Sequence, residues 1–130
     1  MKKYGKDIKS KESWDQMAQG YADRLVSEYH NHRLAVINAL IPEELYQKGR
    51  SIFDFGCGDA VLFERFLKNG SHISGIDISA EMVALAKRRL SNLNSDPDLV
   101  SVGGAPELNH IADSSLDAIL SFNVLAYLTD

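Results

Sequence analysis

The first third of the chain has the apolar spacing of helices. Over residues 13–25, apolar side chains recur every three or four positions, which predicts a helix. Gly20 lies inside this run and could divide the helix into two pieces. A second helical stripe over residues 34–41 ends at Pro42, which cannot continue a helix. The sheet is therefore expected to begin after these two segments.

After Gly49 the pattern changes to short apolar runs. Four of these runs predict strands, over residues 51–55, 72–77, 99–102 and 116–122. Helices are predicted over residues 60–68 and 80–90, and Ser79 is a credible N-cap for the second helix. Strands that alternate with helices form a parallel sheet with right-handed crossovers, so the expected fold class is α/β.

Ligands of such sheets bind beyond the carboxyl ends of the strands. The first strand ends at Gly56-Cys57-Gly58, where two glycines allow a sharp turn and the close approach of a ligand. Asp77 ends the second strand about twenty residues later, where a carboxylate can accept both hydroxyls of a ribose. The alternative is that Asp77 only supports the helix entry at Ser79. Together these residues favour a nucleoside cofactor.

The acids near the glycine turn distinguish two classes of cofactor. A dinucleotide fingerprint needs a third glycine at the position of Val61. Asp54 and Asp59 would oppose the charge of a pyrophosphate, whereas they would attract a sulfonium and an ammonium. S-adenosylmethionine carries both cations and a ribose for Asp77, so it is favoured over a nicotinamide dinucleotide. Asp59 can equally be interpreted as the N-cap of the helix over residues 60–68.

Length, composition and charge add further constraints. With 130 residues, 45% of them hydrophobic, the chain has room for one domain over residues 13–130, after a polar tail over residues 1–12. A net charge of −4 gives no general attraction for nucleic acid or an anionic membrane. No apolar run approaches the roughly 18 residues of a membrane span, and no leader peptide is recognisable. The single Cys57 cannot form an internal disulfide, which favours a reducing compartment and a cytoplasmic location.

One heptapeptide and several later stretches point to a known family. Residues 54–60, DFGCGDA, resemble motif I of the class I S-adenosylmethionine-dependent methyltransferases, D-x-G-C-G-x-G. Other stretches resemble the family in order and spacing, over residues 14–21, 75–82, 103–108, 113–119 and 122–128. The resemblance implies a Rossmann-like sheet with strand order 3-2-1-4, flanking helices and N-terminal helices. Because family members continue with further strands, we expect the chain to be the N-terminal, cofactor-binding part of a longer enzyme.

The resemblance also implies a set of cofactor-binding residues. They are Tyr21, Asp54, Gly56, Cys57, Gly58, Asp59, Asp77, Ile78, Met82, Gly104, Ala105 and Asn123. In this set Asp54 orders the glycine turn and holds the ammonium of the methionine moiety, and Asp77 holds the ribose. Met82 either packs against the adenine or belongs to the core. Asn123 either holds the carboxylate of the methionine moiety or merely ends a strand. Tyr21 either covers the cofactor or belongs to the core. No catalytic residue is assigned, because methyl transfer depends mainly on proximity and alignment.

Two positions depart from the pattern of the family. Ala60 replaces the third glycine of motif I, which is tolerable if its φ is negative. Gly104 stands where the family usually has an acid that bonds the adenine amino group. The backbone N–H of Ala105 could still serve the ring, and Glu107 could reach in.

The acceptor is expected to be a small molecule. Residues 121–124 read SFNV and lack the [DN]-P-P-[YFW] motif of methyltransferases that act on adenine or glutamine amides. Methylation of oxygen, nitrogen or carbon stays open, and so does homodimerisation. His30 and His32 lie on different sides of a helix, and no metal site is expected. The alternatives are a non-catalytic binding or assembly module and, on weaker grounds, a nicotinamide-dependent oxidoreductase.

Overall fold

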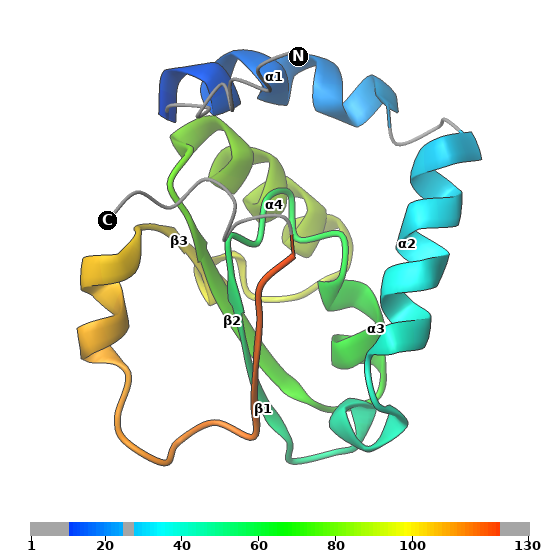
Figure 1. Cartoon of the computed structure of the whole chain (residues 1–130), viewed down its shortest axis with the longest axis vertical. Coiled ribbons are helices and arrows are strands. Elements are labelled where there is room, and N and C mark those ends of the chain that lie inside the picture. Colours follow the sequence, from blue (N-terminus) through cyan, green and yellow to red (C-terminus); the bar gives the residue numbers. More distant parts are fainter. Residues whose placement is uncertain (1–10, 25–27, 123–130) are drawn as a thin grey trace, which may run out of the picture.

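The fold is built on a parallel sheet. The computed structural model describes residues 11–24 and 28–122, with the backbone alone at residues 19, 21–24 and 28–30. The sheet has four strands in the order β3-β2-β1-β4 (Figure 1), which confirms the predicted α/β class and strand order. The strands are β1 (Ser51–Phe55), β2 (His72–Asp77), β3 (Val100–Val102) and β4 (Ala118–Leu120).

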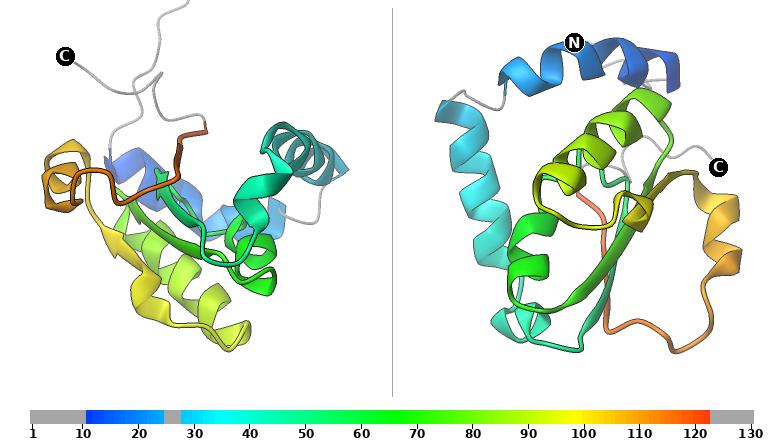
Figure 2. Two further views of the ribbon diagram at one scale, coloured as in Figure 1. Left: turned by 90° about the horizontal axis from the view of Figure 1, so that it is seen from below. Right: turned by 180° about the vertical axis from the view of Figure 1, so that it is seen from behind.

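Helices precede the sheet and connect its strands. The α-helices within the described part of the chain are α1 (Lys11–Arg24), α2 (Glu28–Leu40), α3 (Phe63–Lys68) and α4 (Ala80–Asn92). Short 3-10 helices are η1 (Glu43–Tyr46), η2 (Pro97–Leu99) and η3 (Ala105–His110). Figure 2 shows α3 and α4 on one face of the sheet, and Figure 1 shows α1 across the edge at which the strands end.

The main core lies between the sheet and the helices α3 and α4. Successive residues of a strand point to opposite faces of a sheet. Ile52 of β1 is therefore buried in the main core with Phe63 of α3. Phe53 and Phe55 form a second apolar cluster with Ile76 on the opposite face. Both faces of the sheet thus carry apolar clusters, although Ile119, which pairs with Phe53, is 60% exposed on the second face.

The entry to α4 follows the prediction from the sequence. The Oγ atom of Ser79 accepts a hydrogen bond from the N–H of Met82 at 3.1 Å, which confirms Ser79 as the N-cap. Glu81 in the first turn and Arg89 in the last turn match the helix dipole. The N-terminus of α4 is therefore fixed at the carboxyl edge of the sheet.

Gly75 of β2 has no room for a side chain. A Cβ atom there would lie 2.7 Å from the carbonyl oxygen of Asp54 and 2.9 Å from the Cβ of Cys57. We expect Gly75→Ala to lower the free energy of unfolding by about 1–3 kcal/mol, the usual effect of overpacking a core. Gly20 in α1 provides the matched control, because a Cβ atom there meets nothing within 4 Å. Gly20→Ala should raise the free energy of unfolding by about 0.5–1 kcal/mol. Urea unfolding measures both values, and equal effects would refute the prediction.

Candidate functional site

The turn after β1 is held against β2. The N–H groups of Gly56 and Cys57 both donate to the carbonyl oxygen of Ile76, at 2.8 and 2.9 Å. The φ angles of Gly56 and Gly58 are 80° and 54°, which glycine adopts without steric cost. The turn delays the next helix, which begins at Phe63 and so later than predicted. The glycine turn is therefore ordered by the sheet itself.

Ala60 departs from the expectation for this turn. Its φ is +60°, whereas the prediction from the sequence required a negative φ for an alanine at this position. The left-handed conformation costs a residue other than glycine about 1–2 kcal/mol. The side chain is fully buried in the main core, and burial of one methyl-sized group offsets about 0.8 kcal/mol of this cost. Burial of the Ala60 methyl group thus offsets part of the conformational cost of its positive φ.

Asp77 joins the glycine turn to α4. Its Oδ2 accepts a hydrogen bond from the N–H of Gly58 at 2.8 Å, and its Oδ1 accepts one from the N–H of Ser79 at 2.9 Å. Burial raises the pKa of Asp77, while the two backbone donors act in the opposite direction. The carboxylate therefore supports the entry to α4, as one interpretation held, and also braces the glycine turn.

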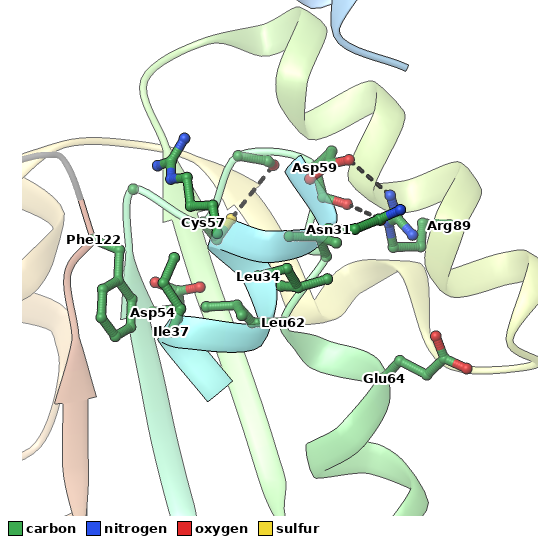
Figure 3. Close-up of a pocket in the computed structure, with 14 residues that line it drawn as sticks. Asn31, Leu34, Ile37, Asp54, Cys57, Asp59, Leu62, Glu64, Arg89 and Phe122 are labelled. Carbon is green, nitrogen blue, oxygen red and sulfur yellow. Dashed lines mark hydrogen bonds and ion pairs between the residues drawn. The ribbon is translucent and has the colours of Figure 1, made fainter. Parts of the chain in front are cut away.

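A cavity of about 320 Å³ opens beside the glycine turn. It is lined by Asn31, Arg33, Leu34, Ile37, Asp54, Gly56, Cys57, Gly58, Asp59, Val61, Leu62, Glu64, Arg89 and Phe122. Figure 3 shows Asp54 and Phe122 on one side of the cavity and Asp59 with Arg89 on the other. The cavity thus combines the motif I residues with a wall from α2.

Asp54 is a deeply buried acid of this cavity that, unlike Asp59, pairs with no cation among the described residues. The residue is 3% exposed, and its carboxylate accepts no hydrogen bond from the residues that the structure describes. Burial, and then the charge of Asp77, raises the pKa of Asp54 to about 7. A buried carboxylate without donors is destabilising unless a cationic group pairs with it. The position is therefore suited to a positively charged ligand group.

Asp59 forms an ion pair instead of capping a helix. Arg89 donates from Nη2 to Oδ2 of Asp59 at 2.7 Å, and from Nε to the carbonyl oxygen of Asp59 at 2.9 Å (Figure 3). The N-cap position of α3 is Leu62, which forms no side-chain cap. The N-cap interpretation of Asp59 is therefore wrong. Because Arg89 compensates the charge of Asp59, only Asp54 of these two acids would oppose the charge of a pyrophosphate.

Arg33, which was not among the predicted site residues, brings a positive charge to the cavity. It comes from α2 and lines the cavity. No ion pair joins it to another residue in the described part of the chain. The apolar stripe of this helix predicted where it packs, but gave no signal for a functional arginine. The cavity therefore presents an unmatched negative group at Asp54 and an unmatched positive group at Arg33.

The predicted residues that follow β2 and β3 lie at the same edge but do not line this cavity. The N–H of Gly103 donates to the carbonyl oxygen of Asp77 at 3.0 Å, which places the turn after β3 beside the end of β2. Ile78 is 50% exposed there. Met82 is buried, and burial fits both of its interpretations. These residues extend the candidate site along the edge, away from α2.

Glu107 folds back onto the turn after β3. Its Oε2 accepts a hydrogen bond from the N–H of Gly104 at 2.6 Å. A Cβ atom at Gly103 would lie 3.0 Å from Cγ of Glu107, so the side chain rests against this turn. The carboxylate of Glu107 is therefore held at this turn. Its contact with an adenine, and that of Gly104 and Ala105, stays a prediction.

The remaining predicted residues are Tyr21, Asn123 and Cys57. The side chain of Tyr21 and the whole of Asn123 lie outside the described residues. Cys57 is buried at the cavity, and burial raises the pKa of its thiol. This agrees with a small residue that fits the turn and disfavours a nucleophile.

Among the described residues, no group of acidic, histidine or cysteine side chains could hold a metal ion. Over the same residues, no helix is long and apolar enough to cross a membrane.

The sequence of this site matches a described family. The family model "Methyltransferase domain" matches residues 52–130, which include the glycine turn and all four strands. The chain belongs to this methyltransferase domain family. The recognition made from motif I and the stretches that follow it is thereby confirmed.

The methyltransferase domain has both curated relatives and solved structural neighbours. The ubiquinone biosynthesis O-methyltransferase of Cronobacter sakazakii is 31% identical over 84 residues, which are 63% of this chain and 33% of that protein. The SAM-dependent methyltransferase from Thiobacillus denitrificans, solved with S-adenosyl-L-homocysteine, has a TM-score of 0.61 at 19% identity and covers 87% of this chain and 44% of that one. For phosphoethanolamine N-methyltransferase 2 from Haemonchus contortus, the TM-score is 0.66 at 18% identity, over 95% of this chain and 30% of that one. The chain thus spans less than half of each of these proteins, and the structural likeness confirms the Rossmann-like fold.

Proposed function

We propose that the chain binds S-adenosylmethionine and forms the cofactor-binding part of a methyltransferase for a small molecule. The observation that carries this proposal is Asp54, a buried carboxylate that lines the cavity and accepts no hydrogen bond from the described residues. The methionine end of the cofactor has an ammonium that can supply this partner. Membership of the methyltransferase family supports the same cofactor.

The two unmatched charges of the cavity suit an amino-acid group. Asp54 lines the cavity from the end of β1, and Arg33 lines it from α2. We assign the ammonium of the methionine moiety to Asp54 and its carboxylate to Arg33. Arginine binds carboxylates through a planar pair of donors, which makes such contacts strong and directional. Asn123, which the sequence suggested for the carboxylate, stays a prediction.

The nucleoside end is assigned to the strand ends beyond the cavity. Asp77 still has lone pairs to accept hydrogen bonds from the ribose hydroxyls, because each of its oxygens receives one backbone donor. Ile78 and the turn at Gly104 and Ala105 then flank the adenine. Glu107 lies at this turn, where its carboxylate accepts a hydrogen bond from the N–H of Gly104.

The chemistry of the proposed reaction requires little from the side chains. When bound, S-adenosylmethionine supplies a methyl group activated by a positively charged sulfur. The residues of this chain hold both ends of the cofactor and so fix the direction in which the methyl group points. Phe122 and Leu34 line the cavity with apolar surface, which limits the access of water. No acid or base is assigned.

The proposed acceptor is a small molecule. The similarity to a ubiquinone biosynthesis O-methyltransferase supports this class, and the net charge of −4 disfavours nucleic acid. A cytoplasmic location stays a prediction from the single cysteine. Homodimerisation stays a prediction too, and the edge strand β4, whose Ile119 is 60% exposed, is where it would occur.

Calorimetric titration with three ligands tests the proposed cofactor. S-adenosylhomocysteine should bind, and at 100 times its Kd it should stabilise the fold by about 2.7 kcal/mol. Methylthioadenosine should bind at least about tenfold more weakly, because it lacks the groups assigned to Asp54 and Arg33. NADH should not bind. Binding of NADH alone would indicate an oxidoreductase, and binding of none of the three would indicate a non-catalytic module.

A further inference from the structure

Asp15 of helix α1 bonds to the start of α4, at the carboxyl edge of the sheet. Figure 1 shows α1 lying over the start of α4, and the two helices pack against each other. Asp15 of α1 accepts a hydrogen bond from the Oγ of Ser79, and its Oδ1 lies 3.4 Å from the N–H of Glu81, which also donates to it. Its other oxygen pairs with Lys11 at 2.9 Å. The carboxylate thus lies at the positive end of α4, where the helix dipole stabilises it.

Ser79 connects this acid to the candidate site. The residue is fully buried, and each of its polar groups has a partner. Its hydroxyl donates to Asp15 and accepts from the N–H of Met82, and its backbone N–H donates to Asp77. Asp77 in turn accepts from the N–H of Gly58. A continuous series of hydrogen bonds therefore runs from α1 to the glycine turn.

Capping of α4 does not by itself require Asp15. Ser79 satisfies the N–H of Met82 with its own oxygen, as an N-cap does. Donation to Asp15 fixes the rotation of the hydroxyl, so that its lone pairs face Met82 and its proton faces α1. A displacement of α1 would break the hydrogen bond from Ser79 to Asp15. The segment that holds Asp77 would then be less firmly fixed.

We propose that Asp15 is a positioning residue that couples the docking of α1 to cofactor binding at Asp77. The proposal rests on the proposed function, since it takes the ribose to bind Asp77. Asp15 acts through Ser79 and does not touch the cofactor. Coupling of this kind is reciprocal: a cofactor that binds more tightly when α1 is docked also holds α1 in place.

The test uses the whole chain, S-adenosylhomocysteine and three variants. Asp15→Ala removes the acceptor, Asp15→Asn retains an oxygen that can accept from Ser79, and Lys11→Ala removes only the ion pair on the far side of the carboxylate. We expect Asp15→Ala to raise the Kd about tenfold, within the range of about 5 to 150 found for coupled sites. Asp15→Asn should recover most of the affinity, and Lys11→Ala should change it less than about twofold.

Trp14 provides a second readout, because it is the only tryptophan of the chain and adjoins Asp15 in α1. Bound S-adenosylhomocysteine should reduce acrylamide quenching of Trp14 in the wild type and in Lys11→Ala, and should not reduce it in Asp15→Ala. If Asp15→Ala lowers the melting temperature but leaves the Kd and the ligand effect on quenching unchanged, Asp15 is merely structural and the proposal is overturned. If the wild type does not bind S-adenosylhomocysteine, the proposed function fails and the coupling fails with it.

Discussion

Replacing Asp77 with alanine is expected to raise the Kd for S-adenosylhomocysteine about 100-fold or more while the chain stays folded. The substitution removes the acceptor assigned to both ribose hydroxyls, and hydrogen bonds to a charged group contribute about 1.5–3 kcal/mol each. It also leaves the N–H groups of Gly58 and Ser79 without their partner, which loosens the glycine turn. Calorimetric titration gives the affinity, and circular dichroism shows whether the fold is kept.

Asp113→Ala is the matched control for this experiment. Asp113 is exposed, in the segment before β4, and far along the chain from the glycine turn. It should change neither the affinity nor the fold. An unchanged Kd in Asp77→Ala would mean that Asp77 only supports the helix entry, and the ribose assignment would be rejected.

Asp54→Asn is expected to remove a pH dependence of stability. The folded protein raises the pKa of Asp54 from 3.8 to about 7, so the folded state binds this proton more tightly than the unfolded state does. The resulting stabilisation is fully present below about pH 4 and is lost as the pH rises to about 7. At about 1.36 kcal/mol per pKa unit, the loss reaches about 4 kcal/mol.

The comparison between wild type and variant isolates this effect. Asp77 also has a raised pKa, whereas Asp117 has a lowered pKa because of its bonds to the N–H of Ser51 and to Arg50, so the total pH profile mixes several groups. Urea unfolding from pH 4 to pH 8 should therefore be measured on both proteins. Asp54→Asn should equal the wild type near pH 4 and be more stable by several kcal/mol at pH 8. Parallel profiles would show that Asp54 does not titrate in this range.

Local patterns in the sequence were sufficient for the framework of the fold. The alternation of strands and helices implied a parallel sheet, and its order β3-β2-β1-β4 followed from the family resemblance. Ser79 could be identified as an N-cap because capping depends on residues a few positions apart. The same holds for the glycine turn, whose two glycines adopt the positive φ angles that their residue type permits.

The features that the sequence could not predict depend on distant partners. The ion pair between Asp59 and Arg89 joins two residues that each had a plausible local role, as an N-cap and as a helix-dipole partner. The positive φ of Ala60 goes together with the burial of its methyl group in the main core, which the local sequence does not reveal. Arg33 of α2 and Asp15 of α1 each stand among several other polar residues of their helix, and nothing in the local sequence distinguishes them. In each case the feature depends on segments that are far apart along the chain, and no local sequence pattern shows that they meet.

The bracing of the glycine turn has a consequence for how quickly a ligand is captured. Three backbone donors of this turn are already satisfied by the end of β2, so little conformational freedom is left to lose when the cleft fills. The glycine turn itself should then need no slow rearrangement during association, so any slow step belongs to the docking of α1. Differences in affinity among ligands would consequently reside in how fast they leave.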